Sequence, residues 1–229
     1  MGDGLYLYCI VPAGHSPPPG LHGLDDLPVG DVRLGDIAAW VSARADPPRP
    51  SLEAIERHNA VVEAAMTDRV TPVPLRFGQW IPTAAELPSM TADRAAGWAA
   101  ALADLAGFRE YGVRVLDPAR EVAARDVRPS SATSGRAYLA DIARNAEQAA
   151  HRQHDADRVA HALRIRLGPL VARERVEPLP TTHGVASIAH LVRISDAAVY
   201  RRAVDEAAAT MPALRFLTSG PWPPYSFAE

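Results

Sequence analysis

The C-terminal end of the chain constrains its fold more than any other segment. Residues 218–227 read Thr-Ser-Gly-Pro-Trp-Pro-Pro-Tyr-Ser-Phe. The Gly-Pro pair is expected to end the strand before it, because proline has no N–H for a sheet ladder. Three prolines then stiffen an extended path that carries the large apolar side chains of Trp222, Tyr225 and Phe227. Free tails are usually small, polar and loose, so we predict that this tail is ordered and docked. The simplest docking site for the tail is the core of the second domain, and a partner protein is the alternative.

The rest of the chain reads as two mixed segments of strands and helices. A polar stretch rich in proline and serine, from Asp117 to Gly135, separates them. We therefore predict an N-terminal α+β domain at residues 1–117, a linker at 118–134, and a C-terminal α+β domain at 135–229 that carries the docked tail.

Hydrophobic periodicity and turn residues place the elements. The predicted strands are 5–11, 32–34, 37–44, 71–79, 108–116, 176–179, 185–194 and 214–218, and the predicted helices are 51–68, 83–106, 136–167 and 196–210. Pro72 and Pro74 are two residues apart, so both missing N–H groups lie on the same side of their strand. This spacing predicts an edge strand, or a strand with one poorly paired side.

Composition excludes several classes of function. The formal net charge is −3, and all 24 basic residues are arginine. Such a balance gives no general attraction to nucleic acid or to an anionic membrane. Cys9 is the only cysteine and lies in an apolar run, so we expect a buried thiol and no disulfide within the chain. There is no signal-peptide pattern and no apolar stretch long enough to span a bilayer, which favours a soluble cytoplasmic protein.

Motifs for catalysis or metal binding are missing from the sequence. No phosphate-binding glycine loop and no nucleophile elbow is present. His151, His154 and His161 share one arc of a predicted helix, but His161 lies roughly 10 Å along the axis from His154, too far to share an ion. His183 and His190 could supply further ligands only if the fold brought them close. We therefore expect no metal and no cofactor.

One polar pair lies beside an apolar stripe. In the helix that Ser51 is expected to cap, Asn59 falls on the apolar face and His58 at its border. The simpler interpretation is a polar pair satisfied in the core. The alternative is a small oxygenase-like enzyme with a pocket around His58, Asn59, Arg76 and Glu110.

Several short blocks, taken in order, resemble the GvpF/GvpL family of gas vesicle proteins. They are Leu5-Tyr6-Leu7-Tyr8, His58-Asn59, Thr71-Pro72-Val73-Pro74-Leu75-Arg76-Phe77-Gly78, Glu110-Tyr111-Gly112-Val113, Gly135-Arg136-Ala137-Tyr138-Leu139, and Gly220-Pro221-Trp222-Pro223-Pro224-Tyr225-Ser226-Phe227. Together they span nearly the whole chain, from Leu5 to Phe227. Tyr111 stands where the family more often has tryptophan.

The resemblance implies an accessory protein of gas vesicle formation. It implies two α+β domains, the second ferredoxin-like, and contact with the hydrophobic shell protein GvpA and with other accessory proteins. It carries no catalytic residue. The candidate partner-binding residues are Pro72, Pro74, Arg76, Phe77, Trp222, Tyr225 and Phe227.

Overall fold

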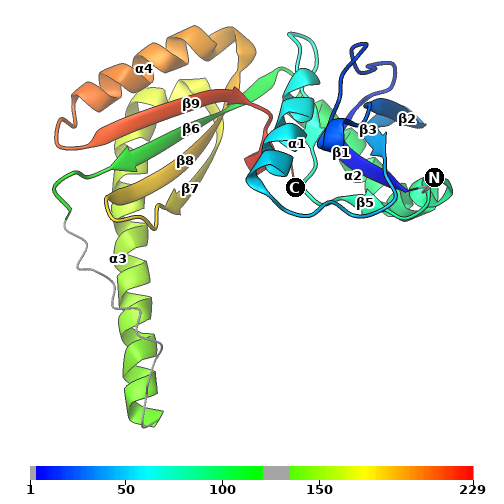
Figure 1. Cartoon of the computed structure of the whole chain (residues 1–229). Helices are drawn as coiled ribbons and strands as arrows, with labels where there is room; N and C mark the ends of the chain where they lie inside the picture. Colours follow the sequence, from blue (N-terminus) through cyan, green and yellow to red (C-terminus); the bar gives the residue numbers. More distant parts are fainter. Residues whose placement is uncertain (1–3, 121–134, 229) are drawn as a thin grey trace. The chain divides into compact units, whose positions relative to one another are not determined.

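The structure is a computed structural model that describes residues 4–120 and 135–228. Contacts divide the chain into two compact units (Figure 1). The first unit comprises Met1–Glu110 together with Pro221–Glu229, and the second comprises Tyr111–Gly220. The chain therefore returns to the first unit at its C-terminal end.

The first unit contains a five-stranded antiparallel sheet. Its order is β2-β3-β1-β4, and β5 also pairs with β1. The elements are β1 (Leu5–Pro12), β2 (Gly30–Leu34), β3 (Ile37–Ala43), α1 (Leu52–Ala64), β4 (Val73–Pro74), β5 (Trp80–Ile81) and α2 (Leu87–Leu105). β1 is central and entirely buried up to Val11, as expected for an apolar run rich in strand formers.

Local signals fix several boundaries in this unit. The Ser51 side chain accepts a hydrogen bond from the Ala54 N–H and caps α1. Gly35 (φ 72°) and Gly107 (φ 78°) adopt the left-handed conformation in the β2–β3 turn and after α2. Residues 71–79, predicted as one strand, form ladder pairs only at β4, because Pro72 and Pro74 cannot donate to a ladder. β4 lies at the edge of the sheet, which confirms the prediction from the two prolines.

The second unit contains a four-stranded antiparallel sheet and two helices. Its elements are β6 (Phe108–Leu116), α3 (Gly135–Leu167), β7 (Val171–Pro178), β8 (Gly184–Arg193), α4 (Ala197–Ala209) and β9 (Arg215–Trp222). The strand order is β7-β8-β6-β9. The ferredoxin-like topology remains a proposal, which the element order β-α-β-β-α-β supports.

One face of this sheet carries the core of the second unit. Tyr111, Val113 and Val115 alternate along β6 and pack with the buried side chains of both helices. The helix residues in this core are Ala156, Val159, Ala160, Leu163 and Leu167 from α3 and Tyr200, Val204 and Ala207 from α4. Both helices thus cover the same face.

The unit boundaries differ from those expected from the sequence. The strand at residues 108–116, predicted to close the first domain, is an inner strand of the second sheet. The chain passes between units within β6 and again at Gly220–Pro221. Of the expected linker at 118–134, residues 121–134 lie outside the described part of the chain. Strand pairing decides this difference, because β6 finds its partners more than 60 residues further along the chain.

Candidate functional site

The C-terminal tail docks on the first unit. Pro223 and Pro224 are buried, and Tyr225–Phe227 form one half-buried turn of 3-10 helix. Tyr225 packs against the core around Tyr6, Tyr8 and Trp40. The prediction of an ordered, packed tail is confirmed, but the tail packs on the core of the first unit and not on that of the second.

The start of the tail is different from its end. The sequence predicted that the strand would stop at the Gly-Pro pair, but β9 continues through this pair to Trp222. Proline is tolerated there because β9 is an edge strand. The Trp222 side chain is 40% exposed, so removing it cannot cost the stability of a fully buried tryptophan.

Three hydrogen bonds hold the end of the tail. The Tyr225 hydroxyl donates to Asn59 Oδ1 on α1 (2.9 Å). The Ser226 N–H donates to Glu110 Oε2 and the Ser226 hydroxyl to Glu110 Oε1, both at 2.8 Å. Hydrogen bonds to a carboxylate are among the stronger ones in proteins. We call Asn59, Glu110, Tyr225 and Ser226 the tail site.

Burial keeps the tail tyrosine neutral. Desolvation raises the pKa of Tyr225 well above its usual range, and the nearby Cys9, Glu63, Tyr6 and Glu110 raise it further. A neutral hydroxyl is what the contact with Asn59 needs, since it must donate a proton to the amide oxygen.

His58 lies beside the tail site and ties three segments of the first unit together. Its Nε2 contacts the Leu75 carbonyl (2.9 Å) and its Nδ1 contacts the Tyr6 hydroxyl (2.8 Å). A carbonyl can only accept, so Nε2 carries the proton and Nδ1 accepts from Tyr6. The Tyr6 oxygen in turn accepts from the Gly78 N–H (3.2 Å). Burial lowers the pKa of His58 to about 4, against a smaller opposing effect of the hydrogen bond to Leu75.

Residues 71–77, which we call the proline block, are held by hydrogen bonds at both Thr71 and Leu75. The Leu75 N–H donates to the Tyr8 carbonyl (3.0 Å) and the Thr71 hydroxyl to the Phe108 carbonyl (3.1 Å). Buried Arg109 donates to the Thr71 hydroxyl (2.6 Å), to the Val70 carbonyl (3.2 Å) and to the Thr67 carbonyl. The proline block is thus an ordered part of the first unit.

The predicted binding residues differ in accessibility. Pro72 and Pro74 are buried, and Phe77 is half-buried beside the Tyr6 ring, 6.0 Å between centroids. Arg76 and Trp222 are exposed. The two prolines are therefore not accessible to a partner, and the accessible candidates are Arg76 and Trp222.

Three of the four residues of the alternative enzyme pocket form hydrogen bonds within the protein, namely His58, Asn59 and Glu110. The fourth, Arg76, is exposed. The sequence identified these three positions but not their partners Tyr6 and Ser226. Two tyrosines in a strand as apolar as β1 were a usable signal, because buried hydroxyl groups need hydrogen-bond partners.

The histidines considered for a metal site are spread over the second unit. His151, His154 and His161 are exposed on α3, His183 is exposed, and His190 is buried. Within residues 4–120 and 135–228, no three histidine, cysteine or acidic side chains come together as a possible metal site. In the same residues, no helix has the length and apolarity to cross a membrane.

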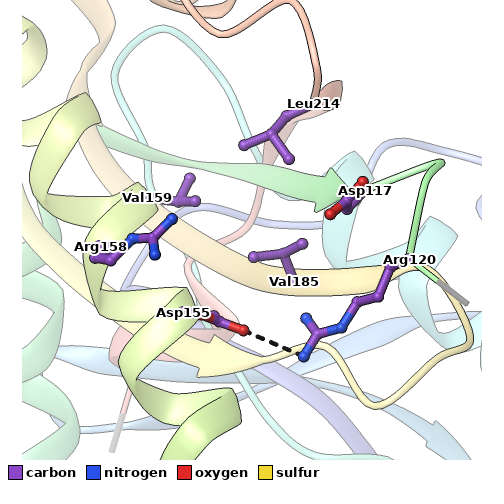
Figure 2. Close-up of a pocket in the computed structure, with 7 residues that line it drawn as sticks. All are labelled: Asp117, Arg120, Asp155, Arg158, Val159, Val185 and Leu214. Atoms are coloured by element: carbon purple, nitrogen blue, oxygen red, sulfur yellow. Dashed lines mark ion pairs between the residues drawn. The ribbon is translucent and has the colours of Figure 1, made fainter. Parts of the chain in front are cut away.

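A small pocket lies in the second unit (Figure 2). It has a volume of about 170 Å³ and is lined by Asp117, Arg120, Asp155, Arg158, Val159, Val185 and Leu214. Arg120 and Asp155, both in the lining, form an ion pair (3.2 Å). The lining holds two carboxylates and two guanidinium groups, which offset each other, and none of the predicted site residues.

Comparisons with known proteins agree with the architecture and with the sequence blocks. The family model described as gas vesicle synthesis protein GvpL/GvpF matches residues 4–229. Gas vesicle protein L1 of Halobacterium salinarum is 27% identical over 259 residues, covering 100% of this chain and 91% of that protein. Gas vesicle protein F1 of the same organism is 24% identical, covering 80% of this chain and 72% of that protein.

Solved structures share the fold. The crystal structure of GvpF from Anabaena sp. PCC7120 matches with a TM-score of 0.72 and 21% identity, covering 99% of this chain and 98% of that one. GvpF from Microcystis aeruginosa matches with a TM-score of 0.72 and 22% identity, covering 99% of both chains. The match of the family model over nearly the whole length decides the assignment: the chain belongs to the GvpL/GvpF family of gas vesicle proteins.

Proposed function

We propose that the protein is an accessory protein of gas vesicle formation that binds the hydrophobic shell protein GvpA, together with other accessory proteins, while the vesicle is assembled. It acts in the cytoplasm and at the growing vesicle, by binding and not by catalysis. Family membership supports the accessory role. The use of His58, Asn59 and Glu110 as structural hydrogen-bond partners supports a role without catalysis.

One observation carries the binding part of the proposal. The first turns of α1 expose two large apolar side chains, Leu52 (73% exposed) and Ile55. Residues spaced by three or four share one side of a helix, so Leu52, Ile55 and Asn59 form one stripe. The tail residue Tyr225 bonds to Asn59, the third member of this stripe, and leaves the first two open.

An apolar stripe of this kind suits a hydrophobic helix or strand of the shell protein. Contiguous exposed apolar side chains, especially those with a polar rim, mark binding surfaces, whereas single exposed apolar residues are common on any protein. In this proposal the exposed candidates Arg76 and Trp222 are further contact residues, and the partly buried Phe77, Tyr225 and Phe227 act by packing within the first unit. Pro72 and Pro74 would act only by holding the block in place.

A pull-down against the shell protein of the same organism tests the proposal. We expect Leu52→Asp with Ile55→Asp to abolish capture of the shell protein, since both changes put charge on the proposed surface. Met90→Asp on α2 is the matched control, because Met90 is an apolar residue of the same unit whose exposure (52%) lies between those of Leu52 and Ile55. Retained capture by the double variant would refute this surface, and no capture by the unaltered protein would refute shell binding itself.

A further inference from the structure

In the part of the chain that the structure describes, the two sheets present five outer strands, and four of them are protected against pairing with another chain. β4 and β5 are each two residues long, and β4 follows Pro72 and contains Pro74. β2 carries Asp31 and Arg33 among its five residues. β7 carries Arg173, Glu174, Arg175 and Glu177 among its eight. Short length, proline and charge are the usual means of protecting an edge.

β9 has none of these protections from Phe216 to Gly220, and its single proline, Pro221, lies near its end. It is eight residues long, and its single charged residue is Arg215 at the start. Leu217 is 49% exposed, and Thr218 and Ser219 are exposed as well. Figure 1 shows β9 along one side of the second sheet, and the strand order places it at the edge beside β6.

The edge is nevertheless firmly held. Phe216 packs on the core of the second unit. Arg201 on α4 donates to the Gly220 carbonyl (3.0 Å). A cross-chain strand would therefore meet a preformed template and lose little entropy in ordering β9.

We propose that β9 pairs antiparallel with β9 of a second copy, about a two-fold axis at Thr218. This inference is independent of shell-protein binding. A two-fold contact of this kind brings the same strand face to face with itself. Thr218 then lies opposite its own copy, Leu217 opposite Ser219, and Phe216 opposite Gly220.

The side chains of β9 complement one another in this register. Each large residue meets a small one, and an aromatic side chain across from a strand glycine is a favourable arrangement. Two threonines facing each other also form a favourable cross-strand pair. Residues 216–220 are uncharged, so no like charges come together, whereas the charges of β7 would oppose pairing of that edge with another chain.

A charge exchange at Thr218 tests the pairing by sedimentation equilibrium. We expect the unaltered protein to dimerise reversibly, and Thr218→Lys and Thr218→Glu each to weaken the dimer about tenfold or more, because like charges then face each other. Mixing the two variants should restore the dimer. Glu177→Gln on β7 changes the net charge by the same amount as Thr218→Lys and should leave the dimer intact.

A cross-link gives a second readout. Cys9 is buried, so a cysteine introduced as Thr218→Cys is the only accessible thiol, and mild oxidation should join two copies covalently. Glu177→Cys is the matched control and should remain uncoupled. A protein that stays monomeric up to about 0.2 mM, or a dimer indifferent to both charge variants and to cross-linking at residue 218, would overturn the proposal.

Discussion

Each unit of the protein buries one histidine against a tyrosine, and the two pairs are completed in different ways. In the first unit, His58 accepts from Tyr6 and donates to the Leu75 carbonyl. In the second, His190 accepts from Tyr200 (2.8 Å) and contacts Glu174 (3.2 Å), which also pairs with Arg164. One histidine is enclosed by neutral groups, and the other is joined to a surface ion pair.

The two units also differ in the charge near their buried histidine and in how each hydrophobic core is completed. Burial lowers the pKa of both histidines, but at His190 the carboxylate of Glu174 opposes the shift. The second unit closes its core with its own two helices. The first unit needs residues from the far end of the chain, because Tyr225 completes its core.

Removing the tail should have the largest effect. A chain ending at Gly220 loses the buried part of Tyr225 and Phe227 and three hydrogen bonds, so we expect the first unit to lose roughly 3–6 kcal/mol of stability. Unfolding in urea measures this loss through the fluorescence of Trp40, Trp80 and Trp98, which all lie in the first unit, while circular dichroism also follows the helices of the second unit. Equal destabilisation of both units would contradict the asymmetry.

Replacing the two buried histidines should have the next largest effect on stability, and the loss should be larger for His58 than for His190. His58→Leu leaves the Tyr6 hydroxyl and the Leu75 carbonyl without their partner in a buried place, which should cost about 4 kcal/mol. His190→Leu should cost about 2 kcal/mol, because Glu174 keeps its pairing with Arg164. Denaturant unfolding of the two variants ranks them, and a larger loss for His190→Leu would reverse the comparison.

Acid should lower the stability of the first unit by a similar amount, because His58 becomes protonated. The pKa of His58 is about 4 in the folded protein, below the unfolded value of 6.5, so the unfolded chain binds the proton more readily between these values. The contribution of neutral His58 is full above about pH 6.5 and is lost as the pH falls towards 4, by about 3 kcal/mol in total. Stability measured from pH 7 to pH 4 should fall steeply in the unaltered protein and less steeply in His58→Leu. Parallel curves would show that His58 is not the group responsible.

The smallest effect concerns a single contact of the tail site. Tyr225→Phe and Asn59→Ala each remove one half of the hydrogen bond between these residues. A double-mutant cycle on the stability of the first unit should give a coupling of about 1 kcal/mol. Asn59→Ala with Trp222→Ala is the matched control cycle and should give a coupling near zero.

Local sequence signals predicted several elements of both units and part of the tail site. The cap at Ser51, the strand at 108–116 and the polar pair His58-Asn59 beside an apolar stripe all follow from neighbours within one helical turn or one strand. The docking of an aromatic, proline-rich tail also follows from its composition.

The pairing of distant segments did not follow. The sequence around Phe108–Leu116 predicts a strand, but it does not contain the partners, which lie at β8 and β9. Likewise, the tail residues predict docking but not the side chain that receives them. Glu110 receives Ser226 across 116 positions of the chain, and contacts of such separation are set by packing of the whole unit and not by local preference.

Hydrogen exchange measured by mass spectrometry tests most directly whether the tail is a structural part of the first unit. The full chain is compared with a chain ending at Gly220, near neutral pH. We predict faster exchange on tail removal in α1 and in residues 71–78, and no change in residues 156–167 or in β8. Faster exchange confined to α3 and β8, or no change anywhere, would contradict the account.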